Sequence, residues 1–266
     1  MSSPVSRTLR WSVALLPVLW ATAALAQLGA PPPPPPANSR EAAPQDFTGY
    51  WVSLVTEDWR YRMLTPDKGD YSGISLTPAG RALADKWDPA QDEASGNQCK
   101  SYGAPAIMRV PTRLHIQWQG DNELRIDTDA GKQTRVLHFN AKPPASAAPS
   151  LQGYSVASWE GLRARGTGGV ATTLGERQKA PPQGYMKVVT TQLKPGYLRK
   201  NGVPYGADTQ LMEYFDSFKE PDGTSWLIVT TVITDPEFLA QQYIASEQFK
   251  KLPGPTGWNP SECEAR

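Results

Sequence analysis

Polar and apolar residues alternate between residues 112 and 139, and this alternation predicts three strands joined by two tight turns. In the first two strands, apolar side chains occupy every second position, namely Leu114, Ile116, Trp118, Leu124 and Ile126. Directly opposed residues in antiparallel strands face the same side of the sheet. The apolar face is therefore continuous only if Ile116 pairs with Ile126, which requires a three-residue turn at residues 120–122.

The remainder of the chain adds further strands, which we expect at residues 47–55, 154–159, 185–193, 209–218, 225–234 and 243–249. Thr77 and Pro78 begin a short helix that we expect to continue to Trp87. The Gly- and Pro-rich residues 161–184 are expected to form a loop. Consecutive hairpins without alternating helices predict an antiparallel up-and-down barrel of about eight or nine strands, with a β-sandwich as the alternative.

Arg135 falls on the apolar face of the meander if the second turn has two residues, at 130–131. A two-residue turn pairs Leu124 with Leu137 and brings Arg135 to the same side. A guanidinium group in that place needs a partner. Arg135 either pairs with an internal carboxylate such as Glu213, or stands at the barrel mouth and binds the anionic head of a ligand.

Residues 57–63 combine charged and aromatic side chains more densely than any other part of the chain. If they form a strand, its charged side carries Asp58, Arg60 and Arg62. Those charges either face solvent or form the polar wall of a ligand site. Two consecutive carboxylates such as Glu57 and Asp58 would face opposite sides of a flat strand, so they could not address one substrate together.

The N-terminus has the pattern of a Sec-type signal peptide cleaved after Ala26. Arg7 and Arg10 precede an apolar run at residues 11–23, which is followed by an Ala-Leu-Ala cleavage signal. The alternative, a membrane anchor, would need roughly 20 apolar residues. We therefore expect a periplasmic or secreted protein with no integral membrane segment after cleavage.

After residues 1–26, the signal peptide, the chain divides into a linker and one domain. Residues 27–45 include six consecutive prolines and are expected to form an extended linker. Residues 46–266 are long enough for a single barrel domain with a full core.

Cys99 and Cys263 are the two cysteines of the chain. An exported chain with two cysteines usually pairs them, so we predict a disulfide between these residues. A reactive thiol or a metal site is the alternative, but neither cysteine has a second Cys or His at ligand spacing.

The mature chain is close to neutral. The whole sequence has 27 basic and 26 acidic residues, and removal of Arg7 and Arg10 leaves 25 against 26. This balance argues against nucleic acid or an anionic membrane surface as a partner. We expect a monomer without a cofactor.

His115 and His138 are the two histidines of the chain, and both are expected opposite the apolar face. They fall on the first and third strands of the meander, which separates them by roughly 16 Å. They cannot share one metal ion, and we expect no metal site.

The beginning of the domain, with Phe47, Gly49 and Trp51, resembles the F-x-G-x-W opening of lipocalin-like proteins. Several blocks together resemble a widespread, uncharacterised family of exported bacterial β-barrel proteins: the Cys99 region with residues 103–108, residues 133–135, residues 153–161, Asp235-Pro236 and Cys263-Glu264. This resemblance covers about residues 46–264 and implies a lipocalin-like barrel but no activity. Many members have His where this chain has Tyr154, so chemistry that depends on that His would be lost here.

Three functions are compatible with these patterns. The first is a barrel that binds a small apolar or amphipathic ligand, with Asp58, Arg60, Arg62, Trp118 and Arg135 as candidate ligand-binding residues. The second is a periplasmic hydrolase or isomerase that uses the Asp58, Arg60 and Arg62 cluster, although no nucleophile motif is present. The third is a structural envelope protein with a filled core.

Overall fold

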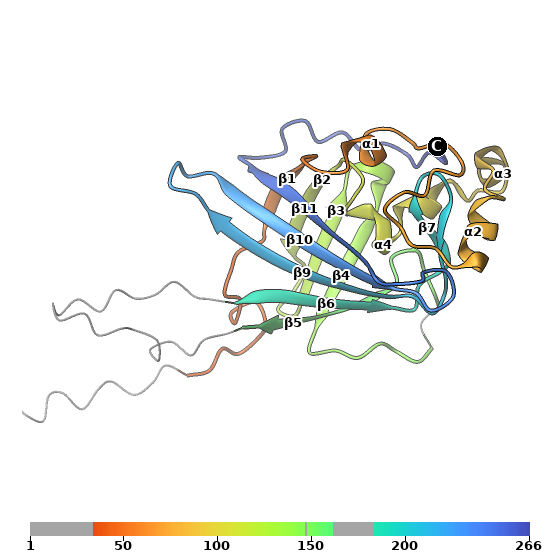
Figure 1. Cartoon of the computed structure of the whole chain (residues 1–266). Coiled ribbons are helices and arrows are strands. Elements are labelled where there is room, and N and C mark those ends of the chain that lie inside the picture. Colours follow the sequence, from red (N-terminus) through yellow and green to blue (C-terminus); the bar gives the residue numbers. More distant parts are fainter. Residues whose placement is uncertain (1–33, 147, 162–183) are drawn as a thin grey trace, which may run out of the picture. The chain divides into compact units, whose positions relative to one another are not determined.

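The computed structural model describes residues 34–146, 148–161 and 184–266. In this part of the chain, nine strands close into a barrel in the order β1-β11-β10-β9-β6-β5-β4-β3-β2 (Figure 1). The barrel strands are β1 (Gly49–Leu54), β2 (Arg113–Trp118), β3 (Glu123–Thr128), β4 (Thr134–Phe139), β5 (Tyr154–Glu160), β6 (Tyr185–Thr191), β9 (Gln210–Lys219), β10 (Ser225–Thr234) and β11 (Tyr243–Leu252). The fold is a mainly β, closed barrel, and the alternative of a sandwich does not apply.

A second, two-stranded sheet pairs β7 (Gly196–Arg199) with β8 (Val203–Tyr205). The short helices are α1 (Trp59–Arg62), α2 (Pro78–Ala84), α3 (Pro89–Ala94) and α4 (Ala104–Ile107). The expected signal peptide and most of the loop expected at 161–184 lie outside the described residues. Within the described ranges, no helix combines the length and the hydropathy needed to cross a membrane.

The predicted register of the meander is confirmed. Ile116 on β2 lies opposite Ile126 on β3, and Leu124 on β3 lies opposite Leu137 on β4. Arg135 lies opposite Ile126 and therefore faces the interior with these apolar side chains. The alternation of the sequence and the two turn lengths together determine which side chains are buried.

The second turn of the meander requires a glycine. Gly131 has a φ of 72°, and a Cβ at this position would lie 2.4 Å from the ring of Tyr102. Glycine tolerates both the left-handed conformation and the close approach. The turn also places Ala130 in the wall of a pocket at one end of the barrel, which is described below.

The barrel is not fully antiparallel, which corrects the expected up-and-down topology. β4 and β5 run parallel, with Leu137 opposite Ser155 and Phe139 opposite Ala157. Parallel neighbours need a connection of about a dozen residues or more, because the chain must return to the starting end of the first strand. Residues 140–153 provide that connection.

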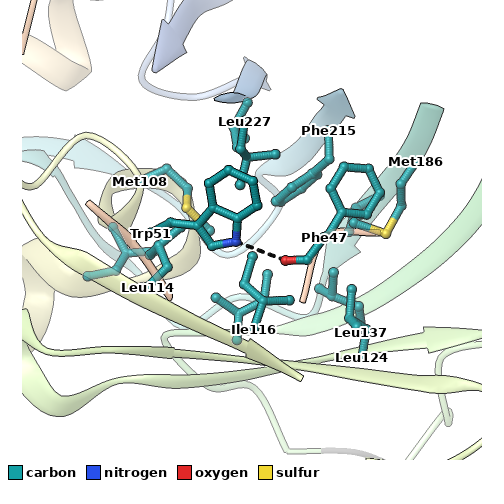
Figure 2. Close-up of a cluster of buried hydrophobic side chains, with 14 of the residues drawn as sticks. Phe47, Trp51, Met108, Leu114, Ile116, Leu124, Leu137, Met186, Phe215 and Leu227 are labelled. Carbon is teal, nitrogen blue, oxygen red and sulfur yellow. Dashed lines mark hydrogen bonds between the residues drawn. The ribbon is translucent and has the colours of Figure 1, made fainter. Parts of the chain in front are cut away.

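Large side chains fill the barrel interior (Figure 2). Trp51 and Phe47 are both buried, and the indole nitrogen of Trp51 donates a 2.9 Å hydrogen bond to the carbonyl oxygen of Phe47. Phe215 from β9 and Leu227 from β10 belong to the same cluster (Figure 2). The residues that resemble a lipocalin opening therefore form part of a packed core.

The helical segment is divided differently from the expectation. The Thr77 side chain accepts a hydrogen bond from the Gly80 amide, as expected for an N-cap, but α2 ends at Ala84 rather than Trp87. Asp88 is the N-cap of α3, and its side chain accepts hydrogen bonds from the amides of Ala90 and Gln91. Proline at the first position of a helix costs no hydrogen bond, so Asp88-Pro89 begins a second helix.

The compact barrel unit begins at Pro36, earlier than the boundary expected at residue 46. Ser39 is buried, and its amide donates to the side chain of Asn122 at 3.0 Å. The Trp159 indole donates to the Ser39 carbonyl oxygen at 2.7 Å. Residues 39–45 thus pack along the barrel instead of forming a free linker.

The predicted disulfide is confirmed between Cys99 and Cys263, which are 164 residues apart in sequence. Cys99 lies in a 3₁₀ turn (Gln98–Tyr102) that precedes α4, and Cys263 lies near the C-terminus. The bridge therefore fixes the C-terminal segment against the end of the barrel where α4 lies.

Candidate functional site

The candidate site is a pocket of about 280 Å³ at one end of the barrel. Its walls come from α1 with the residues that follow it, from the region of α4, from the end of β7, and from the C-terminal segment (Figure 1). The charged side chains among its lining residues are Arg62, Arg109, Arg199, Lys200, Glu262 and Glu264. Four cations against two carboxylates make the lining basic.

Arg62 on α1 is a fixed part of the wall. Its side chain is 1% exposed and donates 2.8 Å and 3.1 Å bonds to the side chains of Glu57 and Ser53. Its Nε donates to the Arg109 carbonyl oxygen at 3.0 Å. Burial lowers the pKa of Arg62, with nearby carboxylates opposing the effect. Because all three guanidinium nitrogens have partners, Arg62 holds α1 in place.

Arg109, which follows α4, joins the pocket to the barrel interior. Its Nη1 lies 3.1 Å from the Glu247 carboxylate, and its Nη2 lies 3.0 Å from the Asp58 carboxylate. The guanidinium carbon is 5.6 Å from the centre of the Tyr243 ring. One cation therefore serves two carboxylates, one from β11 and one from the residue that begins α1.

Glu247 on β11 is fully buried, with an exposed fraction of 0%. Burial raises the pKa of its carboxyl to about 7, although Arg109 and Arg62 oppose the shift. Its second oxygen, Oε2, has no hydrogen-bond partner among the described residues, and the same holds for the Tyr243 hydroxyl. Burial also raises the pKa of Tyr243. This end of the barrel thus contains a carboxyl group that is incompletely bonded.

Arg199 and Lys200, at the end of β7, form no salt bridge with a carboxylate within the described part of the chain. The Arg199 guanidinium stacks 4.3 Å above the Tyr61 ring and donates to the Ser72 carbonyl oxygen at 2.7 Å. The Lys200 ammonium lies 5.0 Å from the centre of the Tyr102 ring. Aromatic faces hold both cations in place without cancelling their charge.

The pocket also has an apolar rim. Met63 and Leu64 line it, and they are 59% and 65% exposed. Trp59 on α1 is another large apolar side chain that faces solvent. A cationic floor beside exposed apolar side chains suits a molecule with an anionic head and an apolar body.

The C-terminal wall is held by the disulfide. Ser261, Glu262 and Glu264 line the pocket on either side of Cys263. The Ser261 amide donates to the Asp129 carbonyl oxygen at 2.9 Å, and Glu262 forms an ion pair with Lys132. This wall therefore depends on a covalent bond and on a few polar contacts at its edge.

The expected strand at residues 57–63 is wrong, because residues 59–62 form α1. Asp58 has a left-handed conformation with a φ of 49°, and its carbonyl oxygen accepts bonds from the Tyr61 and Arg62 amides. The chain thus turns after Asp58 and loses its period of two. Charged side chains that would have shared one side of a strand now point to different partners.

The three members of that cluster are not brought together. Asp58 pairs with Arg109, Arg62 pairs with Glu57, and Arg60 forms an exposed ion pair with Asp70 at 3.0 Å. Of the three, Arg62 lines the pocket and Asp58 touches it through Arg109. The arrangement gives no shared face for the acid–base chemistry expected of a hydrolase or isomerase.

Arg135 lies inside the barrel and forms a bidentate pair with Glu213, at 3.0 Å and 2.7 Å. Its Nη2 also lies 3.2 Å from the hydroxyls of Ser155 and Thr190. Both charged side chains are at most 2% exposed. The interpretation as a structural pair is confirmed, and Arg135 does not line the pocket described here.

Trp118 lies at the other end of β2 from the pocket. Its ring packs against those of Phe139 and Trp159, at centroid distances of 5.5 Å and 6.4 Å. It is a partly buried member of the core.

The two histidines stack against tyrosines. The His115 ring lies 4.2 Å from that of Tyr50, and the His138 ring lies 4.4 Å from that of Tyr154. His138 Nδ1 is also 3.0 Å from the Glu123 carboxylate. Within the described ranges, no group of three His, Cys, Asp or Glu side chains is placed to hold a metal ion.

Sequence reasoning missed the residues that carry most of the site, namely Arg109, Arg199, Lys200, Tyr243 and Glu247. One signal was present for Glu247. It falls in register with Tyr243 and Phe249 on β11, and both of these face the interior. A carboxylate at an inward position, like the guanidinium of Arg135, indicates a buried charge that needs a partner.

The comparisons with known proteins add nothing to this geometry: no family model, no curated protein and no solved structure matches the chain. The resemblance to exported lipocalin-like proteins therefore remains an expectation.

Proposed function

We propose that the protein is an exported binder of a small amphipathic molecule, and that the ligand's anionic head lies against Arg199 and Lys200. The observation that carries the proposal is a pair of cations without a carboxylate partner in the described chain, beside the exposed side chains of Met63 and Leu64. An anionic head would complete the charge pairing, and an apolar body would cover the rim.

Placement at the barrel end follows from the packing of the interior. In a lipocalin-like binder the ligand would lie inside the barrel. Here Trp51, Phe215 and Phe249 are fully buried members of the core cluster that fills this space. Among the proposed binding residues of the sequence, Arg62 is retained as a wall residue, whereas Trp118 and Arg135 are assigned to the core.

Export is part of the proposal. Its support is the N-terminal pattern of Arg7, Arg10 and an apolar run that ends in an Ala-Leu-Ala signal. The disulfide agrees with an oxidising compartment, since such bonds are rare in reducing ones. A small molecule in the periplasm or outside the cell is then the expected ligand.

A matched pair of fluorescent probes tests the proposal. Anilinonaphthalene sulfonate is an amphipathic anion, and N-phenylnaphthylamine is its neutral analogue. We expect the double variant Arg199→Ala, Lys200→Ala to bind the sulfonate about tenfold more weakly or worse, because a charge-assisted contact contributes about 1.5–3 kcal/mol. Binding of the neutral probe should change little.

The control removes two cations at the other end of the barrel. Lys219 ends β9, and Lys250 lies on β11 opposite Trp226. Both lysines lie beside the first residues of β10, at the β9–β10 hairpin, and neither lines the pocket. The double variant Lys219→Ala, Lys250→Ala should bind both probes as the unmodified protein does. Equal weakening of sulfonate binding in both double variants would contradict the proposed site.

A structural role is the second candidate, and the filled core favours it. It predicts that neither probe binds in the pocket and that the variants at Arg199 and Lys200 leave both titrations unchanged.

A further inference from the structure

Arg109 is shared between two carboxylates that differ in their surroundings. Asp58 is 47% exposed at the side chain, whereas Glu247 is fully buried. Asp58 can exchange its ion pair for contacts with water at little cost. Glu247 cannot, because its carboxylate has no access to solvent.

Arg109 also lines the pocket, with a side chain that is 7% exposed. An anion that enters the pocket can therefore reach the guanidinium in place of Asp58. It would then add negative charge to the same guanidinium that already neutralises Glu247. In a buried setting, a second anion near a carboxylate disfavours its ionised form.

We propose that binding of an anion in this pocket is coupled to the uptake of one proton by Glu247, through their shared contact with Arg109. This inference rests on the proposed function and specifies how the same site is regulated. The proton comes from solvent, and no covalent bond forms or breaks. The neutral Glu247 keeps its contact with Arg109, while the ligand's head takes over the charge pairing.

The groups that face Glu247 agree with this coupling. Three of them come from outside β11: Arg109, Arg62 on α1, and Glu57, which precedes α1. The fourth, Tyr243, lies on β11 itself. Tyr243 stays neutral, since burial raises the pKa of its hydroxyl above the ordinary value. Burial places the pKa of Glu247 at about 7, so a modest change in its surroundings shifts its protonation near neutral pH.

The direction of the pH dependence follows from the linkage. Below about pH 7, Glu247 is already protonated, and Arg109 is free to pair with the anion. Above that pH, the ligand can bind only if Glu247 takes up a proton, so the affinity falls. An anion bound by lysine or arginine alone, without this carboxyl, would show no such change in the same range.

Anilinonaphthalene sulfonate is a suitable probe because its sulfonate remains ionised throughout the range. In the disulfide-bonded chain that begins at Gln27, we expect its dissociation constant to rise at least about fivefold from pH 6 to pH 8.5, within the usual range of coupling between sites. The variant Glu247→Gln should bind with the same affinity at both pH values, close to that of the unmodified protein at pH 6. Glu220→Gln, on the far hairpin, should keep the full dependence.

A calorimetric measurement on the unmodified protein does not depend on how Glu247→Gln folds. Titration at pH 8 in buffers with different ionisation enthalpies should report net uptake of protons for each sulfonate bound. No proton uptake, or an unchanged pH dependence in Glu247→Gln, would overturn the coupling. If sulfonate binding needs Arg199 and Lys200 but is independent of pH, the coupling alone fails. If the sulfonate does not bind in the pocket at any pH, both proposals fail.

Discussion

The barrel contains two buried arginine–carboxylate sites that differ in how fully they are bonded. Arg135 and Glu213 use both carboxylate oxygens and gain two hydroxyl contacts from neighbouring strands. Arg109 uses one oxygen of Glu247, and the other oxygen has no partner within the described chain. Both carboxylates are completely buried, so the difference does not come from solvent exposure.

The comparison separates a structural charge pair from one that is suited to change. In the Arg135 pair both oxygens of Glu213 are bonded, although Arg135 Nε has no partner, and removal of either member leaves a buried charge. In the incompletely bonded site, burial outweighs the attraction of Arg109 and raises the pKa of Glu247 to about 7. The second site can therefore respond to a proton or to a ligand.

The largest expected effect concerns the disulfide, which supports the pocket and not the Arg135 site. Cys99→Ser with Cys263→Ser opens a link across 164 residues, and the chain-entropy model gives a loss of about 5 kcal/mol in the free energy of unfolding. Urea denaturation measures this loss. The folded fraction should also bind the sulfonate more weakly, because residues 261–264 form one wall of the pocket.

Retention of full sulfonate affinity by the folded double serine variant would show that the C-terminal wall does not contribute to the pocket. The Arg135 region should be unaffected in either case, since it lies among β4, β5, β6 and β9.

The next effect is the loss of the ion pair between Arg135 and Glu213. Arg135→Leu should lower the free energy of unfolding by about 3–5 kcal/mol, because Glu213 is left buried and unpaired. Arg125→Leu is the matched control, since Arg125 forms a partly exposed pair with Asp127 and should cost at most about 1 kcal/mol. Thermal and urea unfolding measure both variants.

The double variant Arg135→Leu, Glu213→Leu should recover much of the stability, because it removes both charges together. Sulfonate binding should survive in the folded variants. Equal stability of the Arg135 and Arg125 variants would contradict the assignment of Arg135 as structural.

A smaller effect is expected from Glu247→Gln, and it depends on pH. The pKa of Glu247 rises from 4.5 to about 7 on folding, so the native state binds more protons than the unfolded state between these values. The unmodified protein therefore loses stability as pH rises through this window, by up to about 3 kcal/mol in all. The variant lacks this loss.

Urea denaturation at pH 4.5 and pH 8 measures the difference between the two proteins. Glu247→Gln should match the unmodified protein at the lower pH and exceed its stability at the higher one. A lower stability of the variant at pH 8 would mean that the ionised carboxylate stabilises the fold, contrary to this account.

The sequence was sufficient to predict the meander and the disulfide, and it offered the pairing of Arg135 with Glu213 as one of two alternatives. Each of these depends on a local pattern or on a count: alternation with turn length, an inward charge, and an even number of two cysteines. The parallel arrangement of β4 and β5 could not be predicted, because alternation is the same for either strand direction.

The pocket could not be predicted because its residues come from separate elements. Arg62, Arg109 and Arg199 are far apart in the sequence and meet only in the folded chain. Period-two alternation at residues 57–63 also misled the interpretation. The left-handed Asp58 begins a helical turn there, and this conformation leaves little trace in a short charged sequence.

The site in which Glu247 has an unbonded oxygen receives a ligand, whereas the Arg135 site, in which both oxygens of Glu213 are bonded, does not. Nitrogen-15 spectra of the arginine side chains, recorded at pH 6 with and without anilinonaphthalene sulfonate, compare the two sites in one experiment. We expect the Nε–Hε signals of Arg109 and Arg199 to shift on addition of the sulfonate, and the signal of Arg135 to stay unchanged. A shift of the Arg135 signal, or unchanged signals from both Arg109 and Arg199 when the sulfonate is bound, would contradict this account.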